Sequence, residues 1–168
     1  MKRLMIFSWI FLFCFASGLA NAEEMAKKGT ESYTMSYGGP VNLLAMGKDR
    51  VQMNYEGLGI QIGEGLLNNS SFRFMGALQI VKGVYDNDFG LVVFTTPEGH
   101  QAFATYEATG RIGASGKGIY TYIGGTGKLA GLQGGGEFTR ISLRPSAEGT
   151  IQGYNEVKGH WKLPETKE

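Results

Sequence analysis

The sequence is poor in cysteine and histidine, and both shortages exclude kinds of chemistry. Cys14 is the only cysteine, and it lies inside an N-terminal apolar run. A chain cleaved after Ala22 would have no cysteine, which excludes disulfides, thiolate metal sites and cysteine nucleophiles. His100 and His160 are the only histidines, and neither has a His, Asp or Glu partner at a metal-ligand spacing. We therefore expect no metal site and no cofactor.

The sequence also lacks an excess of charge of either sign. It has 16 basic and 15 acidic residues, for a formal net charge of +1, and no basic stripe. A nucleic-acid-binding surface is therefore not expected. After the N-terminal run, no segment is long and apolar enough to span a membrane.

The N-terminus has the three parts of a secretory signal peptide in the expected order. Lys2 and Arg3 precede the apolar run Leu4 to Phe15, and Ala20-Asn21-Ala22 is an A-x-A cleavage site. A short N-terminal anchor is the alternative. We predict a signal peptide at residues 1–22, a flexible lead-in at 23–31, one domain at 32–164 and a tail at 165–168. The expected location is secreted or periplasmic.

Long amphipathic helices are absent from the pattern, and strands dominate it. In Arg50 to Glu56 the apolar Val51, Met53 and Tyr55 alternate with polar residues, which is the period of a strand with one buried face. Turn residues separate the segments at Asp86 to Gly90, Thr96 to Gly99 and Pro145 to Gly149. The other predicted strands are Ser32–Tyr37, Ile60–Gly63, Phe72–Tyr85, Gly90–Thr95, Gln101–Thr109, Gly118–Ile123, Gly136–Leu143, Thr150–Val157 and His160–Leu163.

Glycine is abundant, with 27 residues interleaved with aromatic and β-branched residues at strand spacing. Glycine within strands marks bends and close approaches of the backbone, which a small closed barrel needs at its corners. We predict an all-β fold, a single closed antiparallel β-barrel of about eight strands. A β-sandwich is the alternative.

The most glycine-rich segment, Ile123 to Phe138, contains a Gly-Lys pair but does not fit a phosphate-binding loop. Lys128 is followed by Leu129, where a P-loop needs Ser or Thr, and Tyr122 stands where its first glycine should be. The segment is better interpreted as a wide turn with positive-φ glycines. Leu129 and Leu132 are predicted to tuck into the end of the barrel.

The run Tyr122 to Phe138, YIGGTGKLAGLQGGGEF, resembles a glycine-rich segment of the allene oxide cyclase and dirigent barrel superfamily, and is most similar to its uncharacterised bacterial secreted members. The preceding strand Gln101 to Glu107 and the closing Gly159 to Pro164 also fit, so the resemblance covers Gly99 to Pro164, and Ser32 to Thr96 only by pattern. It implies a calycin-like, eight-stranded barrel, often oligomeric, with an apolar cavity in which plant members cyclise or couple small hydrophobic substrates. It assigns no catalytic residue.

Six polar residues are candidates for a site within such a barrel, and each also has an ordinary structural explanation. Glu107 would be a buried acid or base if its face of Gln101 to Thr109 points inward, and a surface charge if the alanine face does. Arg73 could be an inward cation that orients a carboxylate ligand, or it could point to water, and the same two possibilities hold for Arg140. Tyr120 and Tyr122 share a strand face and, with Tyr106, could offer hydroxyls to a ligand or simply pack.

The sequence favours an exported barrel that binds a small hydrophobic or amphipathic molecule. One alternative is a cofactor-free isomerase or cyclase that uses Glu107 and a tyrosine as acid and base. Another is a barrel filled by its own side chains, acting as a structural or interaction module. A homo-oligomer is compatible with each of these.

Overall fold

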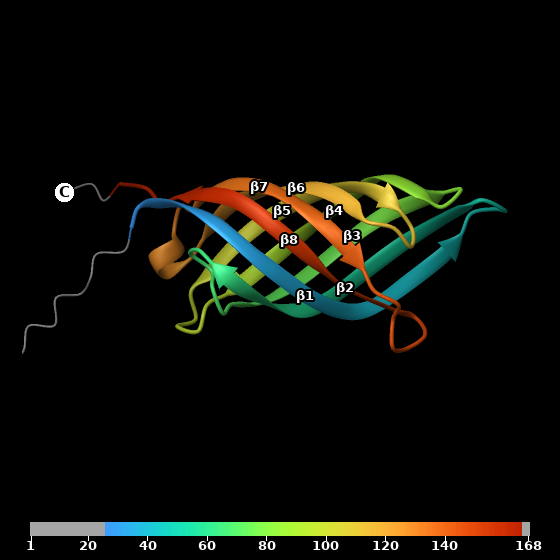
Figure 1. Cartoon of the computed structure of the whole chain (residues 1–168), viewed down its shortest axis with the longest axis horizontal. Coiled ribbons are helices and arrows are strands. Elements are labelled where there is room, and N and C mark those ends of the chain that lie inside the picture. The colour runs from blue at the N-terminus through green and yellow to red at the C-terminus, as the bar shows by residue number, and fades with distance from the viewer. Residues whose placement is uncertain (1–25, 166–168) are drawn as a thin grey trace, which may run out of the picture.

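The computed structural model describes residues 26–165 and shows one closed antiparallel β-barrel (Figure 1). The strands follow one another around the barrel in chain order, and β8 pairs with β1 to close it. They are β1 (Lys28–Ala45), β2 (Arg50–Glu64), β3 (Ser71–Val81), β4 (Val84–Thr95), β5 (Gln101–Arg111), β6 (Gly116–Gly125), β7 (Gln133–Ser142) and β8 (Thr150–Lys162). The predicted all-β closed barrel of about eight strands is confirmed. The predicted signal peptide lies outside the described residues.

Closure leaves no strand edge unpaired. β1 pairs with β2 from Ser32 to Ala45 and with β8 from Lys28 to Pro40, so this long strand serves both neighbours. Lys28 to Glu31, expected to belong to the flexible lead-in, are therefore part of the barrel wall. Edges without partners invite pairing with other chains, and closure removes them without disulfides.

Side chains alternate between the interior and the outer surface, as the pattern of Arg50 to Glu56 predicted. Tyr55 is 6% exposed, whereas Asn54 and Glu56 are exposed. On β1, Glu31, Tyr33 and Met35 are buried in the same alternating way.

Inward-facing aromatic rings lie over glycines on the adjacent strand, which accounts for the abundance of both residue types. A Cβ built on Gly59 would lie 2.3 Å from the Phe72 ring, and one on Gly118 would lie 2.2 Å from the Phe138 ring. Glycine opposite a ring lets the ring lie flat against bare backbone. Eight such direct cross-strand pairs are Gly29–Trp161, Tyr37–Gly153, Tyr55–Gly76, Gly57–Phe74, Gly59–Phe72, Tyr85–Gly110, Gly90–Tyr106 and Gly118–Phe138.

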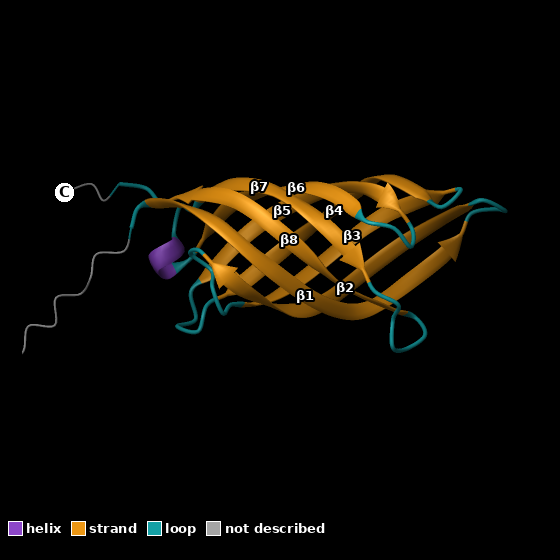
Figure 2. Cartoon of the chain, viewed as in Figure 1, coloured by secondary structure: helices purple, strands orange, loops and turns teal. Residues whose placement is uncertain are grey.

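The two ends of the barrel differ. The β6–β7 connection, with its short helix, lies at the end near the described termini (Figure 2). Its Leu129 and Leu132, 2% and 1% exposed, fill that end together with the fully buried Leu67. This confirms the predicted tucking of both leucines, and the segment forms only one short 3-10 helix, Gly127–Leu129. Among residues 26–165, no helix is long and apolar enough to cross a membrane.

Several predicted boundaries were wrong, two of them at β3 and β4. The predicted strand Phe72 to Tyr85 is divided by a hairpin at Lys82 and Gly83, whose φ angles are 51° and 78°. These angles suit the type I′ turn that joins twisted strands. The predicted turn Asp86 to Gly90 instead lies within β4, where the register with β5 shifts between Tyr85 and Asp88.

Candidate functional site

The barrel encloses a cavity of about 650 Å³. Its mouth lies at the end of the barrel opposite Leu129 and Leu132. Leu43, Ile112, Leu143 and Pro145 contribute to the lining there. Most of the deeper wall is aromatic or aliphatic, from Tyr33, Met35, Tyr37, Met53, Tyr55, Phe72, Phe74, Leu78, Ile80, Tyr85, Val92, Phe94, Tyr106, Tyr120, Phe138 and Val157. A concave, mainly apolar space of this volume falls in the range of small-molecule sites.

A buried ion pair stands at the cavity wall. The Arg140 guanidinium donates through Nη1 to Asp88 Oδ2, and the two side chains are 13% and 0% exposed. Arg140 extends inward from β7 over the rings of Tyr106 and Phe138, 5.9 and 5.7 Å from their centroids. Because the partners neutralise each other, this part of the wall carries no net charge.

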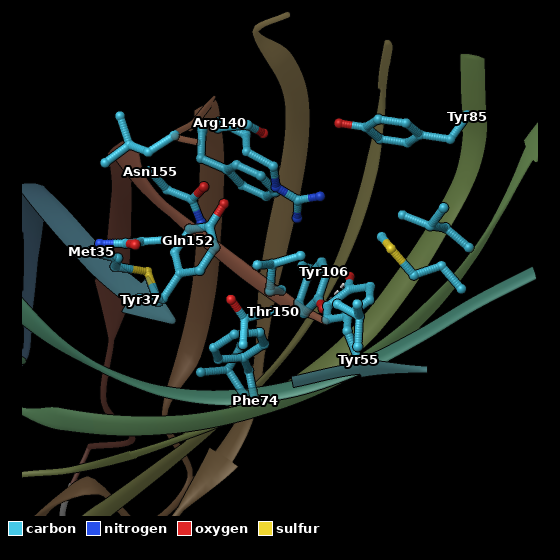
Figure 3. A pocket seen from close by; sticks show the side chains of 18 of the residues that line it. Met35, Tyr37, Tyr55, Phe74, Tyr85, Tyr106, Arg140, Thr150, Gln152 and Asn155 are labelled. Atoms are coloured by element: carbon cyan, nitrogen blue, oxygen red, sulfur yellow. Dashed lines mark hydrogen bonds between the residues drawn. The ribbon is translucent and has the colours of Figure 1, made fainter. Parts of the chain in front are cut away.

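Two tyrosine hydroxyls extend the ion pair into a short hydrogen-bonded chain. Tyr55 donates to Asp88 Oδ1, so the Tyr106 hydroxyl, 2.7 Å from that of Tyr55, donates to Tyr55 in turn. Burial raises the pKa of Tyr106, and the charge of Asp88 raises it further. Both phenols therefore remain protonated donors, and Figure 3 shows Arg140, Tyr37, Tyr55 and Tyr106 around one space.

Two buried polar atoms beside the cavity have no hydrogen-bond partner among the described residues. They are Arg140 Nε and Asn155 Oδ1. Arg140 and Asn155 face each other directly across β7 and β8, and both line the cavity. A buried polar group without a partner destabilises the folded protein. A ligand whose polar group bonds to this pair therefore gains the most binding free energy.

A second polar cluster lies deeper in the barrel, around Glu31. Glu31 is 4% exposed, and its Oε1 accepts hydrogen bonds from Tyr120 and, at 2.9 Å, from Tyr122. Burial raises the pKa of this carboxyl, although the bonds from the two tyrosines and the nearby His160 oppose the rise. Tyr120 separates Glu31 from the cavity, since it lines the cavity and Glu31 does not.

We expect Glu31→Gln to flatten the pH dependence of stability. The carboxyl has a pKa above its ordinary 4.5 in the folded barrel. The protonated Glu31 therefore contributes fully to the stability of the fold below pH 4.5. The contribution is lost as the pH rises through the folded-state pKa. An amide oxygen still accepts from the tyrosines and does not ionise, so the melting temperature of the variant should fall less from acidic to mildly alkaline pH. Thermal unfolding followed by circular dichroism checks this, and parallel curves for the two proteins would contradict it.

The candidates predicted from the sequence divide between the two surfaces of the barrel. Tyr106 and Tyr120 point inward and line the cavity, and Tyr122 points inward behind it to Glu31. Glu107 is exposed, because the alanine face of β5 is the inner one. Arg73 also lies on the outer surface, where it pairs with Glu56 at 3.1 Å. Of the two arginines weighed, Arg140 is the one in the cavity.

Sequence reasoning missed Asp88 and Glu31. Simple alternation from Tyr85 would place Asn87 inside, but the bulge in β4 moves the inward position to Asp88. Bulges re-aim side chains in this way beside functional sites. Glu31 lies in a polar segment, and no apolar alternation before Tyr33 indicates that its side chain points inward. Within residues 26–165, no group of His, Cys, Asp or Glu side chains is placed to hold a metal ion.

Comparison with protein families found no match, and comparison with curated proteins found none either. Among solved structures, the crystal structure of Ail, the attachment invasion locus protein of Yersinia pestis, aligns with 80% of this chain and 99% of its own. The identity is 8% and the TM-score is 0.18, and a likeness this low carries no argument about function.

Proposed function

We propose that the barrel binds a small, uncharged and mainly apolar molecule, with a polar head beside Arg140 and Asn155. The observation that carries the proposal is the apolar cavity of about 650 Å³, in whose wall Arg140 Nε and Asn155 Oδ1 stand without partners. Apolar contacts would supply the affinity, and the two polar groups would orient the head. The signal-peptide pattern supports a secreted or periplasmic place of action.

The charge balance favours a neutral head. Arg140 is already neutralised by Asp88, whose side chain is fully buried. A carboxylate entering beside them would leave a net negative charge in a desolvated space, which is costly. A carboxamide or a hydroxyketone adds no charge, and it can both accept from Arg140 and donate to Asn155.

Binding of a matched pair of ligands tests this proposal. Decanamide and decanoate share a chain and differ in charge, and each can displace the neutral dye N-phenyl-1-naphthylamine from the protein near neutral pH. We expect decanamide to bind about tenfold or more tightly than decanoate, a difference of about 1.4 kcal/mol. Asp88→Asn leaves Arg140 unbalanced and should reverse the preference.

Glu107→Gln is the matched control, because it removes an acid from the outer surface and should change neither affinity. If the dye and both ligands fail to bind, the binding function is wrong. If decanoate binds the wild type more tightly than decanamide, the cavity is a binding site but its ligand is an anion. A variant with altered circular dichroism is set aside, and the wild-type comparison alone then decides.

A second function on the same cavity is a cofactor-free isomerase or cyclase, in line with the resemblance to allene oxide cyclase and dirigent barrels. The chain Tyr106–Tyr55–Asp88 favours it, because a proton taken from a substrate at the Tyr106 oxygen can pass through Tyr55 to the Asp88 carboxylate and return to the product by the reverse steps. Glu107 has no part in this version, since it lies on the outer surface.

A further inference from the structure

The outer surface of the barrel carries large apolar side chains on four strands, β2, β3, β4 and β6. Eight of them are between 42% and 67% exposed. We define the outer apolar face by Leu58, Ile60, Ile62, Met75, Phe89, Leu91, Ile119 and Ile123. Exposed apolar patches on monomers rarely exceed a few hundred Å², and larger ones mark interaction sites.

Strand register makes this face continuous. Met75 is the direct partner of Leu91, and Arg73 lies between Leu58 on β2 and Val93 on β4. Farther round, Glu107 lies between Phe89 and Ile119. The apolar side chains thus form one surface with charged groups set into it.

The outward positions of β1, β7 and β8 are mainly polar, with Leu44 near the end of β1 an exception, and this argues against lipid as the cover. The outward positions of β8 include Gln152, Glu156 and Lys158, and those of β1 include Ser32 and Thr34. A barrel that crosses a bilayer needs an apolar band around its whole circumference. The Arg73–Glu56 ion pair and Glu107 would also be costly against hydrocarbon chains.

Charge and size together favour a second copy of this chain. The face carries both signs, with Arg73 and Glu56 side chains 70% and 50% exposed, so two copies related by a two-fold axis can place each charge opposite its complement. A standard interface buries about 800 Å² on each partner. Eight large side chains exposed to this degree offer an area of that order. We propose that two copies of the chain associate through the outer apolar face, with the Arg73–Glu56 pairs inside the interface.

Sedimentation velocity of the protein expressed with its full N-terminal sequence tests the proposal. We expect dimers at tens of micromolar, roughly the range of a moderate interface. Leu58 is 67% exposed, so Leu58→Glu leaves the fold intact and should give monomers. Arg73→Glu should weaken association about tenfold or more, and adding Glu56→Arg should restore it.

Lys158→Glu, a charge reversal on the polar side, is the control and should leave the mass unchanged. A wild type that stays monomeric up to about 100 µM, or dimers that survive Leu58→Glu, would overturn the proposal. The variants should still displace the dye from the cavity as the wild type does, so this outcome is independent of the proposed binding function.

Discussion

Arg140→Met is expected to lower the free energy of unfolding by roughly 3–5 kcal/mol, because it leaves a buried carboxylate without its cation. The Asp88 side chain is fully buried, and its remaining hydrogen bond comes from the neutral Tyr55 hydroxyl. Methionine fills much of the volume of the arginine stem, so lost packing contributes less than the lost charge. Urea unfolding followed by circular dichroism measures the difference.

The companion variants separate the charge effect from other causes. Asp88→Asn combined with Arg140→Met removes both charges and should recover most of the loss. Arg73→Met makes the same change in an ion pair whose partners are 70% and 50% exposed, and should cost at most about 1 kcal/mol at concentrations where the chain is monomeric. Equal losses for the two arginines would refute the assignment of Arg140 and Asp88 as a structural ion pair.

Gly39→Ala is expected to cost roughly 3 kcal/mol or more, or to prevent folding. A Cβ at Gly39 would lie 2.0 Å from the Glu56 carbonyl oxygen and 2.5 Å from Gly57 Cα. Both neighbours are backbone atoms of β2, so no side-chain rotation can relieve the overlap. β1 and β2 would have to move apart at Gly39.

The adjacent glycine is the control for this prediction. A Cβ at Gly38 would lie 3.6 Å from the Ile151 carbonyl oxygen, an ordinary contact. Gly38→Ala should therefore be neutral, or stabilise by up to about 1 kcal/mol by restricting the unfolded chain. The urea midpoints of the two variants decide the matter, and similar midpoints would mean that the close approach at Gly39 is not constraining.

The fold could largely be predicted from local patterns, because side-chain alternation and turn residues are properties of short segments. One further boundary failed at glycines that look like breaks. Gly57 and Gly59 seemed to end the strand that starts at Arg50, yet they face inward beneath Phe74 and Phe72 within one continuous strand. A glycine that accommodates a ring from another strand has the same local sequence as a glycine that makes a turn.

The site was harder to predict, because it depends on which face of each strand points into the barrel. For Arg73, the aromatic neighbours Phe72 and Phe74 already imply the answer, since inward rings on both sides place the arginine outside. For Asp88, the decisive feature is a register shift between β4 and β5, which involves residues about twenty positions apart. No local pattern encodes that shift, and the Asp88–Arg140 ion pair follows from it.

The pairing of rings with glycines also constrains how such a barrel can diversify. A side chain at Gly59 would meet the Ser36 carbonyl oxygen at 2.2 Å, so this position is fixed by the backbone. Phe72, which lies over it and lines the cavity, can be exchanged for a smaller residue at a moderate cost in stability. Descendants of this protein that acquire new ligands should therefore keep the glycines and vary the rings, so the interior would be reshaped while the wall is inherited.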